Sequence, residues 1–96
     1  MLDVENKYVR CKDIIIKSIN DLYYAFNLSD GSEYKINEVS YDILEFLAEP
    51  HYLKEVFENI VKVYDVSEEQ LRDDMELWFD FALSHMIVQT YYEESN

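Results

Sequence analysis

Glycine, proline and cysteine are nearly absent from the chain, with one of each among 96 residues. So little glycine and proline leaves few tight turns and excludes a flexible low-complexity linker. A lone Cys11 cannot form an internal disulfide, which is typical of a reducing, cytoplasmic compartment. The N-terminal stretch has no apolar signal-peptide core, and no apolar run reaches the roughly 20 residues of a membrane span. The sequence therefore predicts a cytoplasmic protein with no membrane segment.

Positive charge is also scarce, since eight Lys and Arg stand against 21 Asp and Glu and give a net charge of −13. A surface of this sign repels the phosphates of nucleic acids, whose binding depends on neutralisation by cations. It disfavours an anionic membrane surface for the same reason. Basic peptides or a basic protein surface remain permitted partners, although a role in solubility alone explains the charge equally well.

Apolar side chains are plentiful, because hydrophobic residues make up 49% of the chain and aromatic residues 16%. That content is enough for the core of one small domain. We therefore predict a single domain over residues 1–96, with its packed part at about residues 8–90.

The first third of the chain is rich in β-branched and aromatic residues, which favour strands. Asn20-Asp21 suits a two-residue hairpin turn, because both residues tolerate positive φ. The chain's one glycine marks a second turn at residues 29–32. The pattern predicts a three-stranded antiparallel meander with strands at residues 13–19, 22–28 and 33–37.

Helical periodicity follows. The first predicted helix begins at Ser40, a good N-cap, and is closed by Pro50. The second spans about residues 52–64, where apolar side chains recur at helical spacing.

The third predicted helix begins at Ser67, which forms a capping box with Gln70, and it runs to about Ser84. Residues 87–92 predict a short additional strand. Three strands followed by three helices make an α+β fold of the winged helix-turn-helix type.

Groups that carry catalytic or metal chemistry are few and scattered. Cys11, His51 and His85 do not form a nucleophile with its base, and each is expected to be an ordinary structural or surface residue. Four carboxylates share one face of the third helix, but neither a calcium-binding loop nor a histidine pair accompanies them: Glu69, Asp73, Glu76 and Asp80. We therefore expect a solvated acidic face, no cofactor and no enzymatic activity.

The third helix is apolar over an unusually wide arc. At about 100° per residue, its main stripe consists of Leu71, Met75, Trp78, Phe79, Ala82 and Met86. Leu77 and Phe81 lie to one side of this stripe, and Leu83 lies to the other. Either the helix is central and buried on two sides, or one flank of the arc lines a groove for an apolar partner.

The predicted strand 33–37 is an edge of the meander unless another segment covers it. Tyr34 and Ile36 lie on one face of the strand, and Glu33, Lys35 and Asn37 lie on the other. The open backbone of an edge strand is a template for a further strand, from a peptide or from a second copy in a homodimer. An edge strand beside a wide apolar helix is what peptide recognition by strand addition requires.

Three stretches of the chain, YKINEVSYDILEFL, VYDVSEE and DMELWFDFALSHMIV, resemble the PqqD-like domains, also called RiPP recognition elements. The family pattern has a strand ending in Leu-Asn and a helix with a bulky apolar dipeptide. A second helix then ends in Tyr, and a third carries Asp-Val, Phe-Leu and Leu before Gly-Leu-Ile. The matching positions are Ile36-Asn37, residues 43–47, Tyr64, Asp74-Met75, Trp78-Phe79 and Met86-Ile87-Val88. The chain departs from the pattern at two places where the family often has Gly, namely Glu49-Pro50-His51 and Met86.

The resemblance implies a domain that is not an enzyme and that captures the leader segment of a ribosomally synthesised precursor peptide, such as that of a bacteriocin. It also implies a partner maturation enzyme, of the leader-peptidase or radical-SAM type, and a free-standing chaperone role for a chain of this length. The leader would add as a strand beside the third strand and pack against the third helix. The peptide-binding residues implied in this way are Glu33, Tyr34, Lys35, Ile36, Asn37, Leu71, Asp74, Met75 and Trp78.

A winged-helix transcription regulator or an acidic DNA-mimic inhibitor is the alternative. The third helix carries six acidic residues and one arginine, which is the opposite of a helix that reads the major groove.

Overall fold

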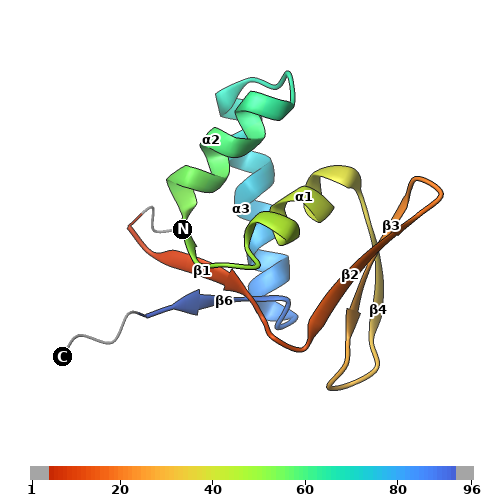
Figure 1. Cartoon of the computed structure of the whole chain (residues 1–96). Coiled ribbons are helices and arrows are strands. Elements are labelled where there is room, and N and C mark those ends of the chain that lie inside the picture. Colours follow the sequence, from red (N-terminus) through yellow and green to blue (C-terminus); the bar gives the residue numbers. More distant parts are fainter. Residues whose placement is uncertain (1–4, 93–96) are drawn as a thin grey trace.

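The computed structural model describes residues 5–92, which contain two small antiparallel sheets and three helices (Figure 1). The strands are β1 (Lys7–Arg10), β2 (Ile14–Ile19), β3 (Leu22–Asn27), β4 (Glu33–Ile36), β5 (His51–Tyr52) and β6 (Val88–Tyr91). The helices are α1 (Glu38–Phe46), α2 (Leu53–Val63) and α3 (Glu68–Ser84). The α+β architecture predicted from the sequence, a three-stranded sheet followed by three helices, is confirmed.

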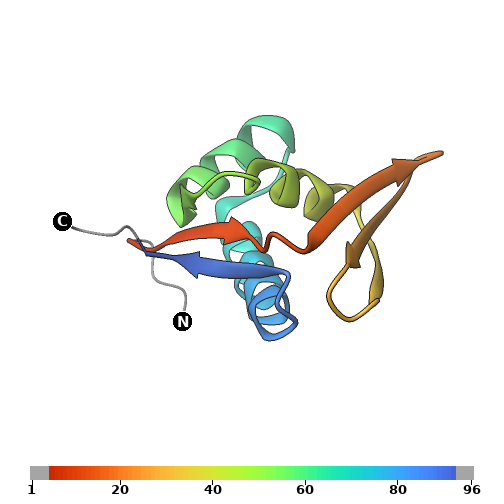
Figure 2. The same cartoon turned by 60° about the horizontal axis from the view of Figure 1, so that its bottom comes forward.

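The predicted meander is the sheet β2-β3-β4. Asn20 and Asp21 have φ of 49° and 64° and form the two-residue turn between β2 and β3, in which Ile19 lies opposite Leu22. Gly31, with φ of 78°, sits in the longer turn between β3 and β4. Both turns lie where local residue chemistry predicted them. Figures 1 and 2 show this sheet extending away from the helices.

A second sheet, with the order β5-β1-β6, was not predicted as a sheet. The sequence indicated the short C-terminal strand that became β6, but it did not indicate β1, a four-residue segment with a charged residue at each end. β1 pairs along its whole length with β6, from Lys7 opposite Tyr91 to Arg10 opposite Val88, and Figure 2 shows the two side by side. Because these partners come from opposite ends of the chain, no local pattern reveals the pairing.

The start of α1 corrects the prediction that Ser40 is the N-cap. Asn37 occupies that position, and its Oδ1 accepts a hydrogen bond of 2.8 Å from the backbone N–H of Ser40. Ser40 therefore lies in the first turn of the helix, where it is buried. The helix also ends earlier than predicted, at Phe46, so that Pro50 follows a short non-helical segment and does not itself terminate the helix.

The other two helices lie where periodicity and capping placed them. Ser67 caps α3 by accepting a hydrogen bond of 3.2 Å from the Gln70 backbone N–H. The side chain of Gln70 donates to Asp74 Oδ1 at 3.1 Å, and the Ser67 N–H does not bond back to the Gln70 amide oxygen, so the predicted capping box is only half formed. Tyr64, just after α2, donates a hydrogen bond from its hydroxyl to the Asp42 carboxylate of α1. Burial, together with that carboxylate, raises the pKa of Tyr64 and keeps the donor protonated.

The core lies where the three helices meet β1 and the start of β2. Phe79 of α3 is fully buried and its ring packs against Tyr8 of β1, with ring centroids 5.0 Å apart. The largest fully buried side chains around it are Ile14, Ile43, Leu44, Leu47, Leu53, Val56, Ile60, Met75 and Val88. Each predicted helix thus contributes its apolar face to the core, as the helical spacing of its apolar residues predicts.

The turn after α3 places Met86 in the left-handed region, with φ of 60°. The Met86 N–H bonds to the Leu83 carbonyl at 3.3 Å and the Ile87 N–H bonds to the Ala82 carbonyl at 2.8 Å. These two bonds form a Schellman motif, whose left-handed position usually holds glycine. The family resemblance leads one to expect Gly at position 86, and the structure shows why: the backbone conformation there is strained for any residue with a side chain.

Replacing Met86 with glycine should stabilise the protein by about 0.5–1 kcal/mol, because Gly adopts positive φ without the steric cost of a Cβ. The Met86 side chain is 64% exposed and contributes little packing that could be lost. Thermal unfolding followed by circular dichroism should show a midpoint higher by roughly 2–8 °C for a domain of this size. Ser84→Gly, inside the last turn of α3, is the matched control and should lower the midpoint instead. A lower midpoint for Met86→Gly would contradict the prediction.

Candidate functional site

The outer edge of β4 is open within residues 5–92, because β4 pairs only with β3. The Asn27 N–H donates to the Ser32 carbonyl at 2.9 Å, which fixes the phase of this antiparallel ladder. Hydrogen-bonded pairs alternate along such a ladder, so the backbone groups of Tyr34 and Ile36 face β3. Those of Glu33 and Lys35 consequently face away from the sheet. The centre of β4 thus offers the N–H and C=O of Lys35 to a further strand.

The side chains of β4 place it next to the C-terminal half of α3. Tyr34 contacts two rings edge-on, those of Phe81 in α3 and of His85, the C-cap of that helix, each with ring centroids 6.0 Å away. Phe81 and His85 stack on each other with centroids 4.1 Å apart. Ile36 is partly buried and packs against the core. One face of β4 is therefore attached to α3, while Glu33 and Lys35 on its other face are exposed.

One face of α3 carries exposed apolar and aromatic groups beside this strand. At about 100° per residue, five side chains of the helix fall within a single arc: Asp74, Leu77, Trp78, Phe81 and His85. Leu77 is 70% exposed and Phe81 is 43% exposed, so both present apolar surface to solvent on the same face of the helix. We call the β4 edge together with this arc the β4–α3 surface.

Trp78 is the anchored member of this arc. Its indole Nε1–H donates to the Ser40 hydroxyl at 2.8 Å, and Ser40 is 6% exposed at the start of α1. Trp78 is partly buried, and an indole donor that is satisfied in this way holds the ring in one orientation. The bond links the first turn of α1, which directly follows β4, to the middle of α3.

The structure divides the predicted peptide-binding residues into two groups. Seven lie on or next to the β4–α3 surface: Glu33, Tyr34, Lys35, Ile36, Asn37, Asp74 and Trp78. The side chain of Asn37 is already engaged as the N-cap of α1. The other two, Leu71 and Met75, are 5% and 2% exposed and belong to the core.

Three residues of the surface were missing from the predicted set: Leu77, Phe81 and His85. Leu77 and Phe81 were visible in the sequence as the flank of the over-wide apolar arc. Without the core as a reference, periodicity did not indicate which flank stays open. The sequence predicts an ordinary surface role for His85, whereas the structure shows it stacked on Phe81.

The charge around the β4–α3 surface is mostly negative. Exposed carboxylates on its strand and helix include those of Glu33, Asp73, Asp74, Glu76 and Asp80, and the nearest cation on β4 is Lys35. A surface of this composition attracts a ligand with basic residues. Its affinity for such a ligand should fall as salt is added.

The other chemically active side chains are engaged in packing. Burial and then the nearby Asp13 raise the pKa of the Cys11 thiol, which keeps it in the unreactive protonated form. His51 stacks on Phe46 with ring centroids 3.9 Å apart and lies 3.5 Å from the Glu55 carboxylate. Within residues 5–92, no three His, Cys, Asp or Glu side chains are grouped so that they could hold a metal ion. Of the helices in that part of the chain, none has the length and apolar character needed to cross a bilayer.

Comparisons with known proteins bear on the family and the fold of the chain. The family model described as coenzyme PQQ synthesis protein D (PqqD) matches residues 19–88, which is most of the chain. A solved structure, TbiB1 in complex with the TbiA(beta) leader peptide, has a similar fold with a TM-score of 0.74 and 16% sequence identity. The similarity covers 88% of this chain and 99% of TbiB1. No curated protein matches the chain in sequence.

Proposed function

Because the chain belongs to the PqqD family, we propose that it binds the leader segment of a ribosomally synthesised precursor peptide and presents it to a modifying enzyme. The leader adds as a strand to the open edge of β4 and places its side chains against α3. The domain acts as a binding module, and the chemistry belongs to the enzyme. A leader peptidase and a radical-SAM enzyme are the partner classes that the family resemblance implies.

The observation that carries this proposal is the combination of an unpaired strand edge with an exposed apolar helix face. Backbone groups of Glu33 and Lys35 supply hydrogen bonds that do not depend on sequence. Leu77, Phe81 and Trp78 supply the apolar contacts that select side chains. The solved complex of TbiB1, which shares the fold, contains a leader peptide and supports this reading.

The alternative of a DNA-binding regulator finds no such support. The outward residues of α3 include Glu68, Glu69, Asp73, Glu76 and Asp80, which would repel phosphates.

The same open edge of β4 would also accept a second copy of this chain. In that case the leader and the second copy compete for one site, and added leader dissociates the dimer.

Titration with the leader peptide of the precursor encoded beside this gene tests the proposal. Trp78 is the chain's single tryptophan and lies on the β4–α3 surface, so its fluorescence reports binding there without a label. We expect a saturable change in Trp78 emission and slower hydrogen exchange at the Lys35 amide, since that N–H becomes bonded to the added strand. A peptide of the same composition in scrambled order is the control. Unchanged emission together with undetectable heat of binding would exclude the proposed function.

A further inference from the structure

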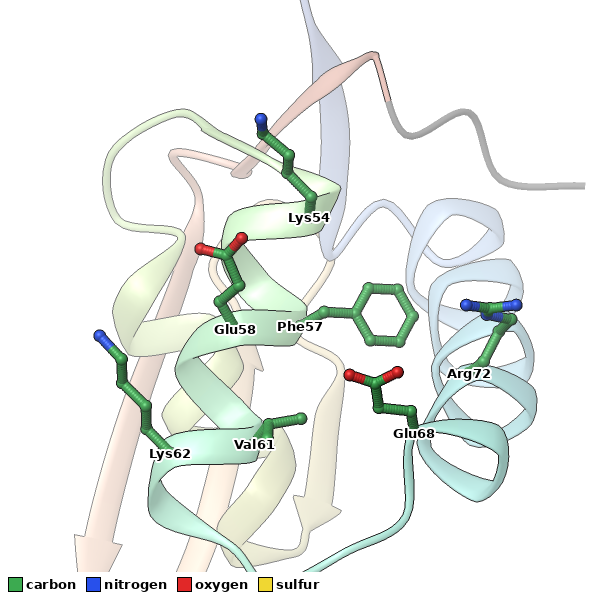
Figure 3. A pocket seen from close by; sticks show the side chains of 7 residues that line it. All are labelled: Lys54, Phe57, Glu58, Val61, Lys62, Glu68 and Arg72. Atoms are coloured by element: carbon green, nitrogen blue, oxygen red, sulfur yellow. The ribbon is translucent and has the colours of Figure 1, made fainter.

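A pocket of about 520 Å³ lies between α2 and the start of α3, away from the β4–α3 surface. Its lining residues come from both helices and are shown in Figure 3: Lys54, Phe57, Glu58, Val61, Lys62, Glu68 and Arg72. Around the axis of α3, Arg72 points about 160° away from Asp74, at about 100° per residue. The pocket and the β4–α3 surface therefore lie on opposite faces of the same helix.

The floor of this α2–α3 pocket is apolar and incompletely covered. Figure 3 shows Phe57 and Val61 pointing from α2 toward α3. Phe57 is partly buried, packs against the core with part of its surface, and lines the pocket, while Val61 is 39% exposed. An aromatic ring and a branched aliphatic side chain that face open space provide a seat for one bulky apolar group.

Cationic side chains outnumber carboxylates around the α2–α3 pocket, although the chain as a whole is strongly acidic. Three of the chain's eight cationic side chains are here, those of Lys54, Lys62 and Arg72, but only two of its 21 acidic ones. Within residues 5–92, none of these three cations forms an ion pair or a side-chain hydrogen bond. Figure 3 shows Arg72 on the α3 side of the pocket and the Glu68 carboxylate pointing from the start of α3 toward α2. Unpaired cations around an apolar floor complement carboxylates that flank an apolar side chain.

We propose that the α2–α3 pocket docks an acidic segment with one bulky apolar anchor, carried by the enzyme that modifies the leader-bound peptide. The assignment of that segment to the enzyme rests on the proposed function. The anchor fills the space between Phe57 and Val61, and its flanking carboxylates pair with Lys62 and Arg72. Since the leader occupies the opposite face of α3, both partners bind at the same time and neither displaces the other.

The first test uses synthetic peptides and ¹⁵N-labelled full chain. We expect acetyl-EEAFEEA-amide, which carries one bulky apolar residue, to shift the amide signals of Phe57, Val61 and Arg72 in a saturable way. The basic counterpart acetyl-KKAFKKA-amide and the anchor-free acetyl-EEAAEEA-amide should leave those signals in place. Equal shifts from the basic peptide, or no saturable shift from the acidic one, would overturn the proposed pocket chemistry.

The second test uses the modifying enzyme and charge reversal. The double variant Lys62→Glu/Arg72→Glu should weaken enzyme binding at least tenfold while leaving leader affinity within about twofold of the parent. The control Lys12→Glu/Lys17→Glu has the same net charge, and its reversed residues are exposed and lie outside the α2–α3 pocket. It should retain enzyme binding to within about threefold. If the two variants lose enzyme binding equally, the effect is one of overall charge and the docking site is wrong.

The outcomes separate the two proposals. Failure of the parent chain to bind leader refutes the proposed function, whatever the pocket does. If leader binds normally and the Lys62→Glu/Arg72→Glu variant binds enzyme as tightly as the parent, the proposed function stands and the docking site does not.

Discussion

Replacing Lys35 with proline should weaken leader binding at least tenfold, which corresponds to about 1.4 kcal/mol. Proline has no backbone N–H, so the substitution removes the central donor on the open edge of β4. The pyrrolidine ring also occupies the space in which an added strand would lie. Losing a backbone hydrogen bond, and leaving its partner on the leader unpaired, costs about 1–3 kcal/mol. Isothermal titration of parent and variant with the same leader peptide measures the effect.

The fold should tolerate this change, because the Lys35 N–H faces away from β3 and the residue is exposed. Proline is accepted on edge strands whose N–H points to solvent. An unchanged Trp78 emission maximum in the free variant would show that the helices still pack correctly.

Lys35→Ala is the matched control, since it removes the charged side chain and keeps the backbone donor. We expect it to bind leader within about threefold of the parent, or more tightly if the leader is basic. If Lys35→Pro bound leader as well as Lys35→Ala does, strand addition at β4 would be excluded.

Much of the fold could be predicted because turns and helix ends are determined by residues close together in the sequence. Asn20-Asp21 determined one turn through positive φ, and Ser67 located the start of α3 through its cap. The cap of α1 was misplaced because Asn37 and Ser40 are both good N-cap residues three positions apart. In the structure Asn37 caps the helix, and the Ser40 hydroxyl instead accepts a hydrogen bond from the indole of Trp78, far along the chain. The sheet β5-β1-β6 escaped prediction for the same kind of reason, since only contacts between distant segments define it.

The site was predictable to a similar extent. The open edge of β4 follows from its place as the last strand of a meander, and the structure retains it. On α3, the apolar arc was too wide for periodicity to divide into a buried part and an open part. The fold turns Met75 and Phe79 toward the core, sets Phe81 against Tyr34 of β4, and leaves Leu77 exposed one turn earlier on the helix. The helix wall of the proposed site is therefore rotated toward Leu77 relative to the residues expected from the family resemblance.

This rotation leads to a prediction for Leu77→Asp, which should weaken leader binding at least tenfold without unfolding the protein. Leu77 is 70% exposed, so its replacement should change the free energy of unfolding by no more than about 0.5 kcal/mol. In the proposed complex the same position faces the leader, so a carboxylate there would lose the apolar contact and would itself be desolvated. Fluorescence titration at Trp78 and urea unfolding measure the two quantities separately.

Val63→Asp is the control for Leu77→Asp, because Val63 is also a helical residue with a large exposed fraction, 64%, but lies on α2. It introduces the same charge and should leave leader affinity within about twofold of the parent. Equal losses in the two variants would point to an effect of the added negative charge and not of position. Added negative charge alone should not weaken the binding of a basic leader. A loss of affinity in Leu77→Asp that Val63→Asp does not share would therefore indicate that the leader contacts α3 at this position. If Leu77→Asp retained full affinity, the leader would have to be bound through the β4 edge without this face of the helix, and the proposed geometry of the site would be wrong.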